Sequence, residues 1–200
     1  MGLRPQWIEA EGLALRHWRF WLEPGAADQL LVLLRQQIPW RQEAITLFGR
    51  THPLPRLTCW VGDPGCAYAY SGLLNQPEPW TPPLEELRTQ LGEQLGFRFN
   101  SLLLNRYRQG DDRMGWHADD EITLEPQAPI ASLSLGACRS FRLRRKKPQI
   151  DGQGPITIEL DHGDLLVMDP PTQRHWLHAL PARRRVREER INLTFRVIRG

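Results

Sequence analysis

The chain has 200 residues, a formal net charge of +3 and a pI of about 9.0. Its hydrophobic content of 40% and charged content of 24% are typical of one globular domain with a full-sized core. No apolar run approaches the roughly 18 residues that a membrane span needs, and the opening residues contain no apolar signal segment. These features predict one domain over residues 1–200, no membrane association and no secretion.

Positive charge is concentrated in the C-terminal half, in the runs RLRRKK (142–147) and ARRRVR (182–187). Nearly all of it is arginine, whose planar guanidinium suits phosphate recognition, although genome composition also produces arginine-rich surfaces. The three cysteines, Cys59, Cys66 and Cys138, have no CxxC spacing. We therefore expect a reducing compartment, no disulfide or zinc ribbon, and three small buried thiols.

The first predicted elements are two helices. One covers about residues 26–37 and ends before Pro39. The other follows Thr81, a candidate N-cap, and repeats leucine on one face as far as Gly96, a candidate C-cap. Between them, segments 44–63 and 66–72 are rich in Pro, Gly and aromatic residues, which is typical of hairpins and loops.

After Gly96 the apolar pattern changes to short alternating or β-branched segments separated by Gly, Pro and Asp. Seven strands are predicted, at 99–107, 130–136, 139–145, 156–160, 164–169, 175–180 and 190–198. Strands at this spacing indicate a sandwich or barrel. The fold class is therefore mainly β with bracing helices (α+β), and the helices cover one outer face.

The segment MGWHADDE contains His117 and Asp119, which share one face if the segment is extended. One imidazole and one carboxylate are two thirds of the triad that holds non-haem Fe(II). A second histidine must come from a distant strand, and the candidates are His162, His175 and His178. The alternative interpretation is a solvated polar turn.

The last predicted strand places four polar side chains on one alternation: Arg190, Asn192, Thr194 and Arg196. If its apolar side packs outward, two guanidinium groups point into the barrel, where they need anionic partners. A dicarboxylate such as 2-oxoglutarate supplies two anions. Asn105 and Tyr107, two residues apart on another strand, add neutral donors.

Four stretches together resemble the AlkB family of Fe(II)/2-oxoglutarate dioxygenases. They are NSLLLNRYRQGDDRMGWHADDE (100–121), PIASLSLGACRSFRLR (129–144), HGDLLVMDPPTQRHWLHALP (162–181) and RINLTFRVI (190–198). The resemblance covers residues 45–198 in motif order. It implies a double-stranded β-helix (jelly-roll) core over 97–198, a nucleotide-recognition region at 45–80 with a hairpin, and an N-terminal extension and helix at 1–44.

The resemblance also implies the binding residues. His117, Asp119 and His178 would be the iron ligands; His178 is preferred because Arg190 lies 12 residues beyond it, as the family pattern requires. The 2-oxoglutarate residues would be Asn105, Tyr107, Arg190, Thr194 and Arg196, with Asn192 on the same face. Arg190 would bind the distal carboxylate and Arg196 the end that chelates iron. O2 is the remaining co-substrate.

Within the family, the sequence is most similar to homologues that act on double-stranded DNA. This implies oxidative dealkylation of N-alkylated bases such as 1-methyladenine and 3-methylcytosine, with release of formaldehyde and succinate. The protein would then be a monomer in the cytoplasm or nucleoid, or in the nucleus of a eukaryote. Alternatives are an RNA demethylase, a protein hydroxylase, a zinc hydrolase and a non-catalytic nucleic-acid-binding module.

A duplex substrate must have its damaged base flipped out, which needs a stacking pocket and a side chain to fill the gap. Phe48 with Gly49 is a candidate wedge, and core packing is its alternative role. The expected substrate contacts are phosphates for Arg50 and Arg56, a stacking pocket lined by Tyr68, Ala69 and Tyr70 with Trp60, and the cationic base for Asp120.

Overall fold

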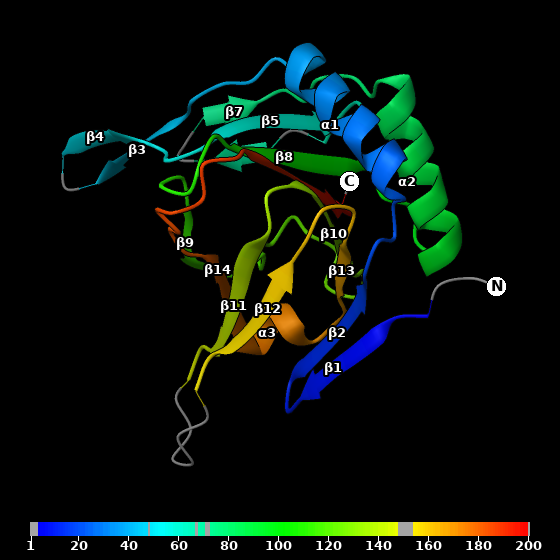
Figure 1. Cartoon of the computed structure of the whole chain (residues 1–200). Helices are drawn as coiled ribbons and strands as arrows, with labels where there is room; N and C mark the ends of the chain where they lie inside the picture. The colour runs from blue at the N-terminus through cyan, green and yellow to red at the C-terminus, as the bar shows by residue number, and fades with distance from the viewer. Residues whose placement is uncertain (1–3, 48, 67, 71–72, 148–153, 200) are drawn as a thin grey trace.

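The computed structural model describes residues 4–47, 49–66, 68–70, 73–147 and 154–199, and of residues 47, 68–70 and 73–75 it describes the backbone alone. Two antiparallel sheets form its centre (Figure 1). The larger sheet has seven strands, in the spatial order β1 (Gln6–Ala10), β2 (Leu13–Trp18), β13 (Leu165–Met168), β10 (Ile130–Gly136), β15 (Arg190–Arg196), β8 (Ser101–Tyr107) and β5 (Leu57–Gly62). The smaller sheet has four strands, in the order β12 (Ile156–Leu160), β11 (Arg139–Arg145), β14 (Trp176–Leu180) and β9 (Met114–His117).

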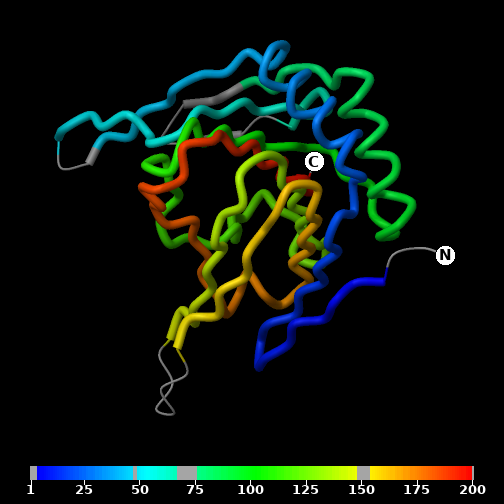
Figure 2. The backbone as a smooth tube through the Cα atoms, viewed as in Figure 1, coloured from blue at the N-terminus to red at the C-terminus, as the bar shows by residue number. Residues whose placement is uncertain are grey.

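Two hairpins complete the strand list: β3 (Ala44–Leu47) with β4 (Arg50–Pro53), and β6 (Tyr68–Tyr70) with β7 (Leu73–Asn75). Figure 2 shows the β3–β4 hairpin extending away from the two sheets. The helices are α1 (Pro24–Gln37), α2 (Pro82–Leu95) and the short α3 (Thr172–His175). Within the described residues, no helix is both long and apolar enough to cross a membrane.

Helices α1 and α2 pack on the outer face of the seven-stranded sheet (Figure 1). Each has proline at its first turn, where the missing N–H costs nothing, and α2 ends at Gly96 in the left-handed conformation with φ +74°. Leucines of both helices meet Ile191, Leu193 and Phe195 of β15 in the largest core cluster. The apolar alternation of β15 therefore faces the helices, which is the condition under which Arg190 and Arg196 point inward.

The other alternation of β15 faces the space between the two sheets. Residues paired across an antiparallel ladder point to the same face, and the register pairs Arg190 with Tyr107 and Asn192 with Asn105. On the other side of β15, Thr194 pairs with Ser132 of β10. The middle of the larger sheet thus presents a polar surface to the interior, beside a second apolar cluster that includes Phe141 and Leu166.

The predicted jelly-roll fold class is confirmed. Each of the seven predicted strands and both predicted helices is present, with ends shifted by no more than a few residues. Strands β1, β2 and β9 were not predicted. Because β2 pairs with β13 and β5 pairs with β8, the larger sheet also contains residues that precede the range predicted for the core, 97–198.

The three cysteines are free thiols. Cys59 and Cys66 are buried as expected, and burial raises the pKa of the Cys59 thiol to about 12. Cys138 is half-buried instead of buried, because it lies in the connection between β10 and β11, just before β11 begins. The prediction of a third buried thiol was therefore wrong.

Candidate active site

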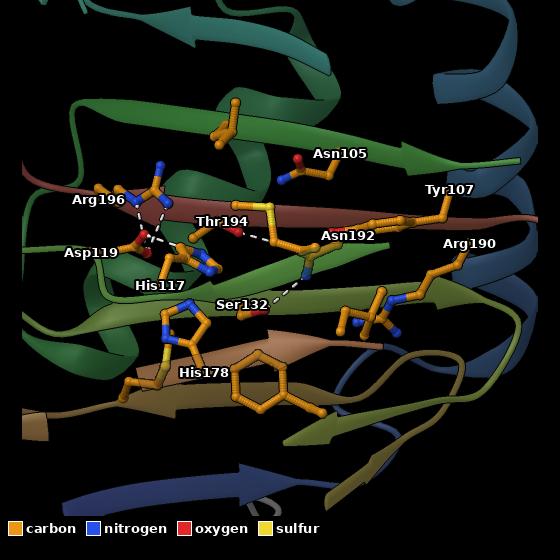
Figure 3. A pocket seen from close by; sticks show the side chains of 15 residues that line it. Asn105, Tyr107, His117, Asp119, Ser132, His178, Arg190, Asn192, Thr194 and Arg196 are labelled. Atoms are coloured by element: carbon orange, nitrogen blue, oxygen red, sulfur yellow. Dashed lines mark hydrogen bonds and ion pairs between the residues drawn. The ribbon is translucent and has the colours of Figure 1, made fainter. Parts of the chain in front are cut away.

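Two histidines and one aspartate converge at one end of the space between the sheets (Figure 3). His117 is the last residue of β9, and His178 lies opposite it in the register of β14. Asp119 follows two residues after the end of β9. One possible ligand atom from each side chain lies within 4.8 Å of the others, and the two imidazole centroids are 4.1 Å apart.

The protonation states of these groups favour cation binding. Burial alone would raise the pKa of the Asp119 carboxyl, but the Arg196 guanidinium, with Nη2 2.8 Å from Asp119 Oδ2, and the two histidines outweigh it and hold the pKa below its usual range. Burial lowers the pKa of His178 to about 3, so this imidazole is neutral near pH 7. A carboxylate and a neutral imidazole are the forms that bind a divalent cation.

Neighbouring groups fix the orientation of the three side chains. His117 Nδ1 lies 2.9 Å from the Gly115 carbonyl oxygen, so a hydrogen on this nitrogen leaves Nε2 free as a ligand. The Asp119 backbone N–H donates to the Gln173 side-chain oxygen at 2.9 Å. Phe141 stacks on His178 with ring centroids 5.2 Å apart. These contacts are made within the protein, so the three side chains are oriented without a metal ion.

Arg190 lies at the other end of the same pocket, beside Tyr107 (Figure 3). Its side chain is 2% exposed, and burial lowers its pKa to about 10, so it stays cationic near pH 7. Its Nη2 donates to Ser134 Oγ at 2.9 Å, while its Nε has no hydrogen-bond partner among the described residues. A buried cation bonded only to neutral oxygens calls for an anion from outside the chain.

A chain of neutral side chains joins the two ends of the pocket. Thr194 Oγ1 donates to Asn192 Oδ1 at 2.9 Å, and Asn192 Nδ2 donates to Ser132 Oγ at 2.8 Å. Asn105 lines the same wall (Figure 3). The pocket thus has a cation at each end, a polar wall between them, and a metal-binding group next to one cation.

Comparison with known proteins agrees with this geometry. The family model described as the 2OG-Fe(II) oxygenase superfamily matches residues 14–196. DNA oxidative demethylase ALKBH2 of Mus musculus is 42% identical over 205 residues, covering 97% of this chain and 84% of that protein. The Homo sapiens ALKBH2 is 40% identical, covering 97% and 77%.

The chain belongs to the AlkB family of 2OG-Fe(II) oxygenases. A further relative, alpha-ketoglutarate-dependent dioxygenase alkB homolog 3 of Rattus norvegicus, is 44% identical over 86% of this chain and 60% of its own length. The solved structure of OsALKBH1 superposes with a TM-score of 0.63 at 19% identity, covering 96% of this chain and 99% of that one, which supports the fold. Members of this superfamily are oxidoreductases that use Fe(II), 2-oxoglutarate and O2.

The donor set of the AlkB-family chain fits these co-substrates. Two imidazoles and one carboxylate are the ligands of the Fe(II) facial triad, and they leave positions open for further ligands. The Nε of Arg190, which no group in the described part of the chain contacts by a hydrogen bond, and its buried charge suit one carboxylate of a dicarboxylate. Arg196, beside Asp119, is placed to meet the other.

The structure brings together in one pocket all residues that the sequence assigned to iron and 2-oxoglutarate. These are Asn105, Tyr107, His117, Asp119, His178, Arg190, Asn192, Thr194 and Arg196. Of the three histidine candidates, His178 is the one that joins this group. The ring of His175 packs against the turn at Gly12, and His162 Nδ1 accepts from the Gly136 N–H at 2.8 Å.

Two side chains that were predicted to contact the substrate are buried. Arg56 is 5% exposed and donates through Nε to Asn105 Oδ1 at 2.8 Å, so it supports the pocket wall. Trp60 is a core residue that donates to the Cys66 carbonyl oxygen at 3.0 Å. The partner of Arg56 lies 49 positions away along the chain, whereas the partner of Trp60 lies six residues away.

Other substrate predictions stay open. Phe48 lies outside the described residues, as do the side chains of Tyr68, Ala69 and Tyr70. Gly49 adopts φ +75° and Arg50 is exposed on β4, which leaves Arg50 free to meet a phosphate. Asp120 is largely exposed and pairs with Lys146, Nζ to Oδ2, at 2.6 Å.

Sequence reasoning missed several residues that line or support the site: Ser132, Ser134, Phe141, Met168 and Gln173. The two serines had a signal, because they are the polar positions of the otherwise apolar strand 130–136. Phe141 and Gln173 carried none, since their contacts join segments far apart in the chain.

Proposed function

We propose that this chain is an Fe(II)/2-oxoglutarate-dependent DNA oxidative demethylase that repairs N-alkylated bases such as 1-methyladenine and 3-methylcytosine. The observation that carries the proposal is the metal-binding group sharing one buried pocket with Arg190, which has no carboxylate partner among the described residues. The substrate class follows the relatives named DNA oxidative demethylase.

His117, Asp119 and His178 would hold Fe(II), and Arg190 and Arg196 would bind the two carboxylates of 2-oxoglutarate. When bound, these co-substrates and O2 supply the oxidation of the N-alkyl group, after which formaldehyde leaves and the base is restored. The chain positions the reactants. Tyr107 and Asn105 offer neutral hydrogen bonds along the wall, and Phe141 shields His178 from water.

A second, larger cavity of about 510 Å³ adjoins the metal-binding group and offers room for a flipped base. Asp119 and Arg196 line both cavities, and Asp120, Glu121 and Lys146 line the larger one. A methylated base carries positive charge, so the Asp120 carboxylate favours it over an ordinary base. Duplex DNA would therefore bind with the damaged base turned out of the stack.

The two basic runs would hold the DNA backbone. Arg144 is exposed on β11 and lies 4.4 Å from the Trp116 ring centre, and Arg184, Arg185 and Arg187 are exposed in the segment between β14 and β15. Contacts with phosphates raise the affinity for DNA but do not distinguish one base sequence from another. We further propose that Phe48 fills the gap left by the flipped base, that the nucleotide-recognition region is residues 45–80, and that the enzyme acts as a monomer in the nucleoid or nucleus.

The substrate assignment is tested with one 1-methyladenine placed in three matched oligonucleotides: a DNA duplex, a DNA single strand and an RNA single strand. We expect the duplex to be repaired with the highest kcat/KM, measured by mass spectrometry of the restored adenine. Faster repair of the RNA would contradict the DNA assignment. Equal repair of both DNA forms would contradict the duplex preference and the wedge role of Phe48.

The Lys146–Asp120 pair makes a separate prediction, with Lys147 as the matched control. Lys146→Met and Lys147→Met each remove one charge from the same basic run, but only Lys146 pairs with Asp120. An exposed pair is worth about 0.2–1 kcal/mol, so we expect Lys146→Met to raise the KM for the methylated duplex by up to about fivefold more than Lys147→Met. Equal KM values for the two variants would mean that the pair does not orient Asp120.

A further inference from the structure

A buried arginine without a role in the proposed chemistry lies behind the Arg190 end of the pocket. Arg139, the first residue of β11, is 1% exposed. Its Nη2 donates to the carbonyl oxygens of Asp112 at 2.9 Å and Pro181 at 2.8 Å, and its Nη1 to that of Gln109 at 3.5 Å. Its Nε has no partner among the described residues. Hydrogen bonds to neutral carbonyl oxygens offset only part of the free-energy cost of burying a guanidinium charge. Stability alone therefore does not explain why Arg139 is buried.

The carbonyls that Arg139 contacts belong to two segments that border the pocket. Asp112 and Gln109 follow β8, which carries Tyr107, and Pro181 lies between β14 and β15, which carry His178 and Arg190. Arg139 Cζ also lies 5.8 Å from the centre of the Tyr107 ring. The Arg139 side chain, at the start of β11, therefore connects the ends of β8 and β14, and all three strands supply pocket residues.

The segment 108–112 is itself closed by Asp112, which accepts from Arg108 through Nε at 2.8 Å, Nη2 at 2.9 Å and the backbone N–H at 2.9 Å. It stacks directly on residues 182–187, which we call the basic loop. Gly110 N–H donates to the Val186 carbonyl at 2.9 Å, and Arg183 N–H donates to the Gly110 carbonyl at 2.7 Å. A Cβ at Gly110 would lie 1.9 Å from the Arg183 carbonyl oxygen, so only glycine permits this approach.

We propose that Arg139 is a positioning residue for two binding sites. It holds Tyr107 and Arg190 in place at the distal end of the 2-oxoglutarate pocket, and it fixes the basic loop against that same end. The exposed arginines of the loop are thereby presented to the DNA backbone at a set distance from the metal-binding group. The DNA half of this inference rests on the proposed function, and the 2-oxoglutarate half rests on the pocket.

The test measures two dissociation constants that need no turnover. One is for 2-oxoglutarate on Mn(II)-loaded protein, by calorimetry, and the other is for an unmodified duplex, by fluorescence anisotropy. Arg139→Met loses two charge-assisted hydrogen bonds, so we expect both constants to rise by about tenfold. Arg142→Met, which removes the same charge three residues along β11, is expected to leave the 2-oxoglutarate constant unchanged.

Gly110→Ala separates the two roles. This substitution disturbs the contact with the basic loop, which lies outside the pocket. We therefore expect the dissociation constant for the duplex to rise by about threefold or more, and the dissociation constant for 2-oxoglutarate to stay within about twofold of the wild-type value. If Arg139→Met lowers the Tm and leaves both constants unchanged, Arg139 acts through packing alone and the inference is wrong.

Arg139→Lys covers the case in which the methionine variant does not fold. The lysine ammonium ends one bond short of the position of Arg139 Nη2, which donates to both segments, so its two dissociation constants should also rise, and wild-type values would overturn the inference. A wild-type protein that binds no duplex would refute both the DNA half and the proposed DNA substrate. The 2-oxoglutarate measurement would still decide the role of Arg139 in the pocket.

Discussion

Asp119→Asn is expected to lower turnover by about a thousandfold or more, because it removes the only anionic ligand of the metal-binding group. Asparagine keeps an oxygen that accepts from Arg196, so the fold should be retained. Asp119→Ala should lose the same activity and also stability, since breaking a buried ion pair costs about 3–5 kcal/mol. The measurements are succinate release, Mn(II) affinity and Tm.

Asp120→Asn is the matched control for the loss of metal binding. It removes the same charge one residue along the chain, from a side chain that lies outside the metal-binding group and pairs with Lys146. We expect its Mn(II) affinity to equal that of the wild type, while Asp119→Asn loses Mn(II) binding. Turnover retained by Asp119→Asn would refute the ligand assignment.

Arg190→Met is expected to change 2-oxoglutarate binding and stability in opposite directions. The guanidinium is buried without a carboxylate partner among the described residues, so an apolar side chain of similar length should leave the Tm of the ligand-free protein equal or higher. The KM for 2-oxoglutarate should rise by about a hundredfold, because a charge-assisted hydrogen bond to the distal carboxylate is lost. Thermal unfolding with and without 2-oxoglutarate measures both effects.

The control for Arg190→Met is Arg106→Met. Arg106 lies on the neighbouring strand β8 and on its opposite face, where it pairs with Glu189 at 2.8 Å. Its loss should leave the KM for 2-oxoglutarate unchanged. A normal KM in Arg190→Met, or an equal rise in Arg106→Met, would remove Arg190 from the 2-oxoglutarate site.

The strands of the jelly roll were predictable where alternation was regular. In 190–196 each apolar residue faces the helices and each polar residue faces the pocket, so one pattern encodes both the packing and the site. The β1–β2 hairpin escaped prediction because both of its faces carry polar residues, with Glu9 and Arg16 on one and His17 on the other. In addition, β2 is stabilised by β13, which lies far along the chain. β9 is short and only partly buried.

The site residues were predictable where the ligand residues themselves form the sequence motif. His117 and Asp119 lie two apart, and the AlkB resemblance selected His178, which the backbone then places opposite His117. The burial of Arg56 had no signal in the sequence, because its bond to Asn105 joins residues 49 positions apart. Contacts of Arg139 with two separate segments carry no local signal at all.

The assignment of this pocket to an iron-dependent demethylase is tested by measuring formaldehyde and succinate together, on a duplex containing 1-methyladenine, with Fe(II), 2-oxoglutarate and ascorbate present. We expect about one formaldehyde per succinate, and neither product when Fe(II) or 2-oxoglutarate is omitted. Succinate without formaldehyde would show a working iron site with a different substrate. The absence of succinate, with metal shown to be bound, would contradict the assignment of this pocket as an active site.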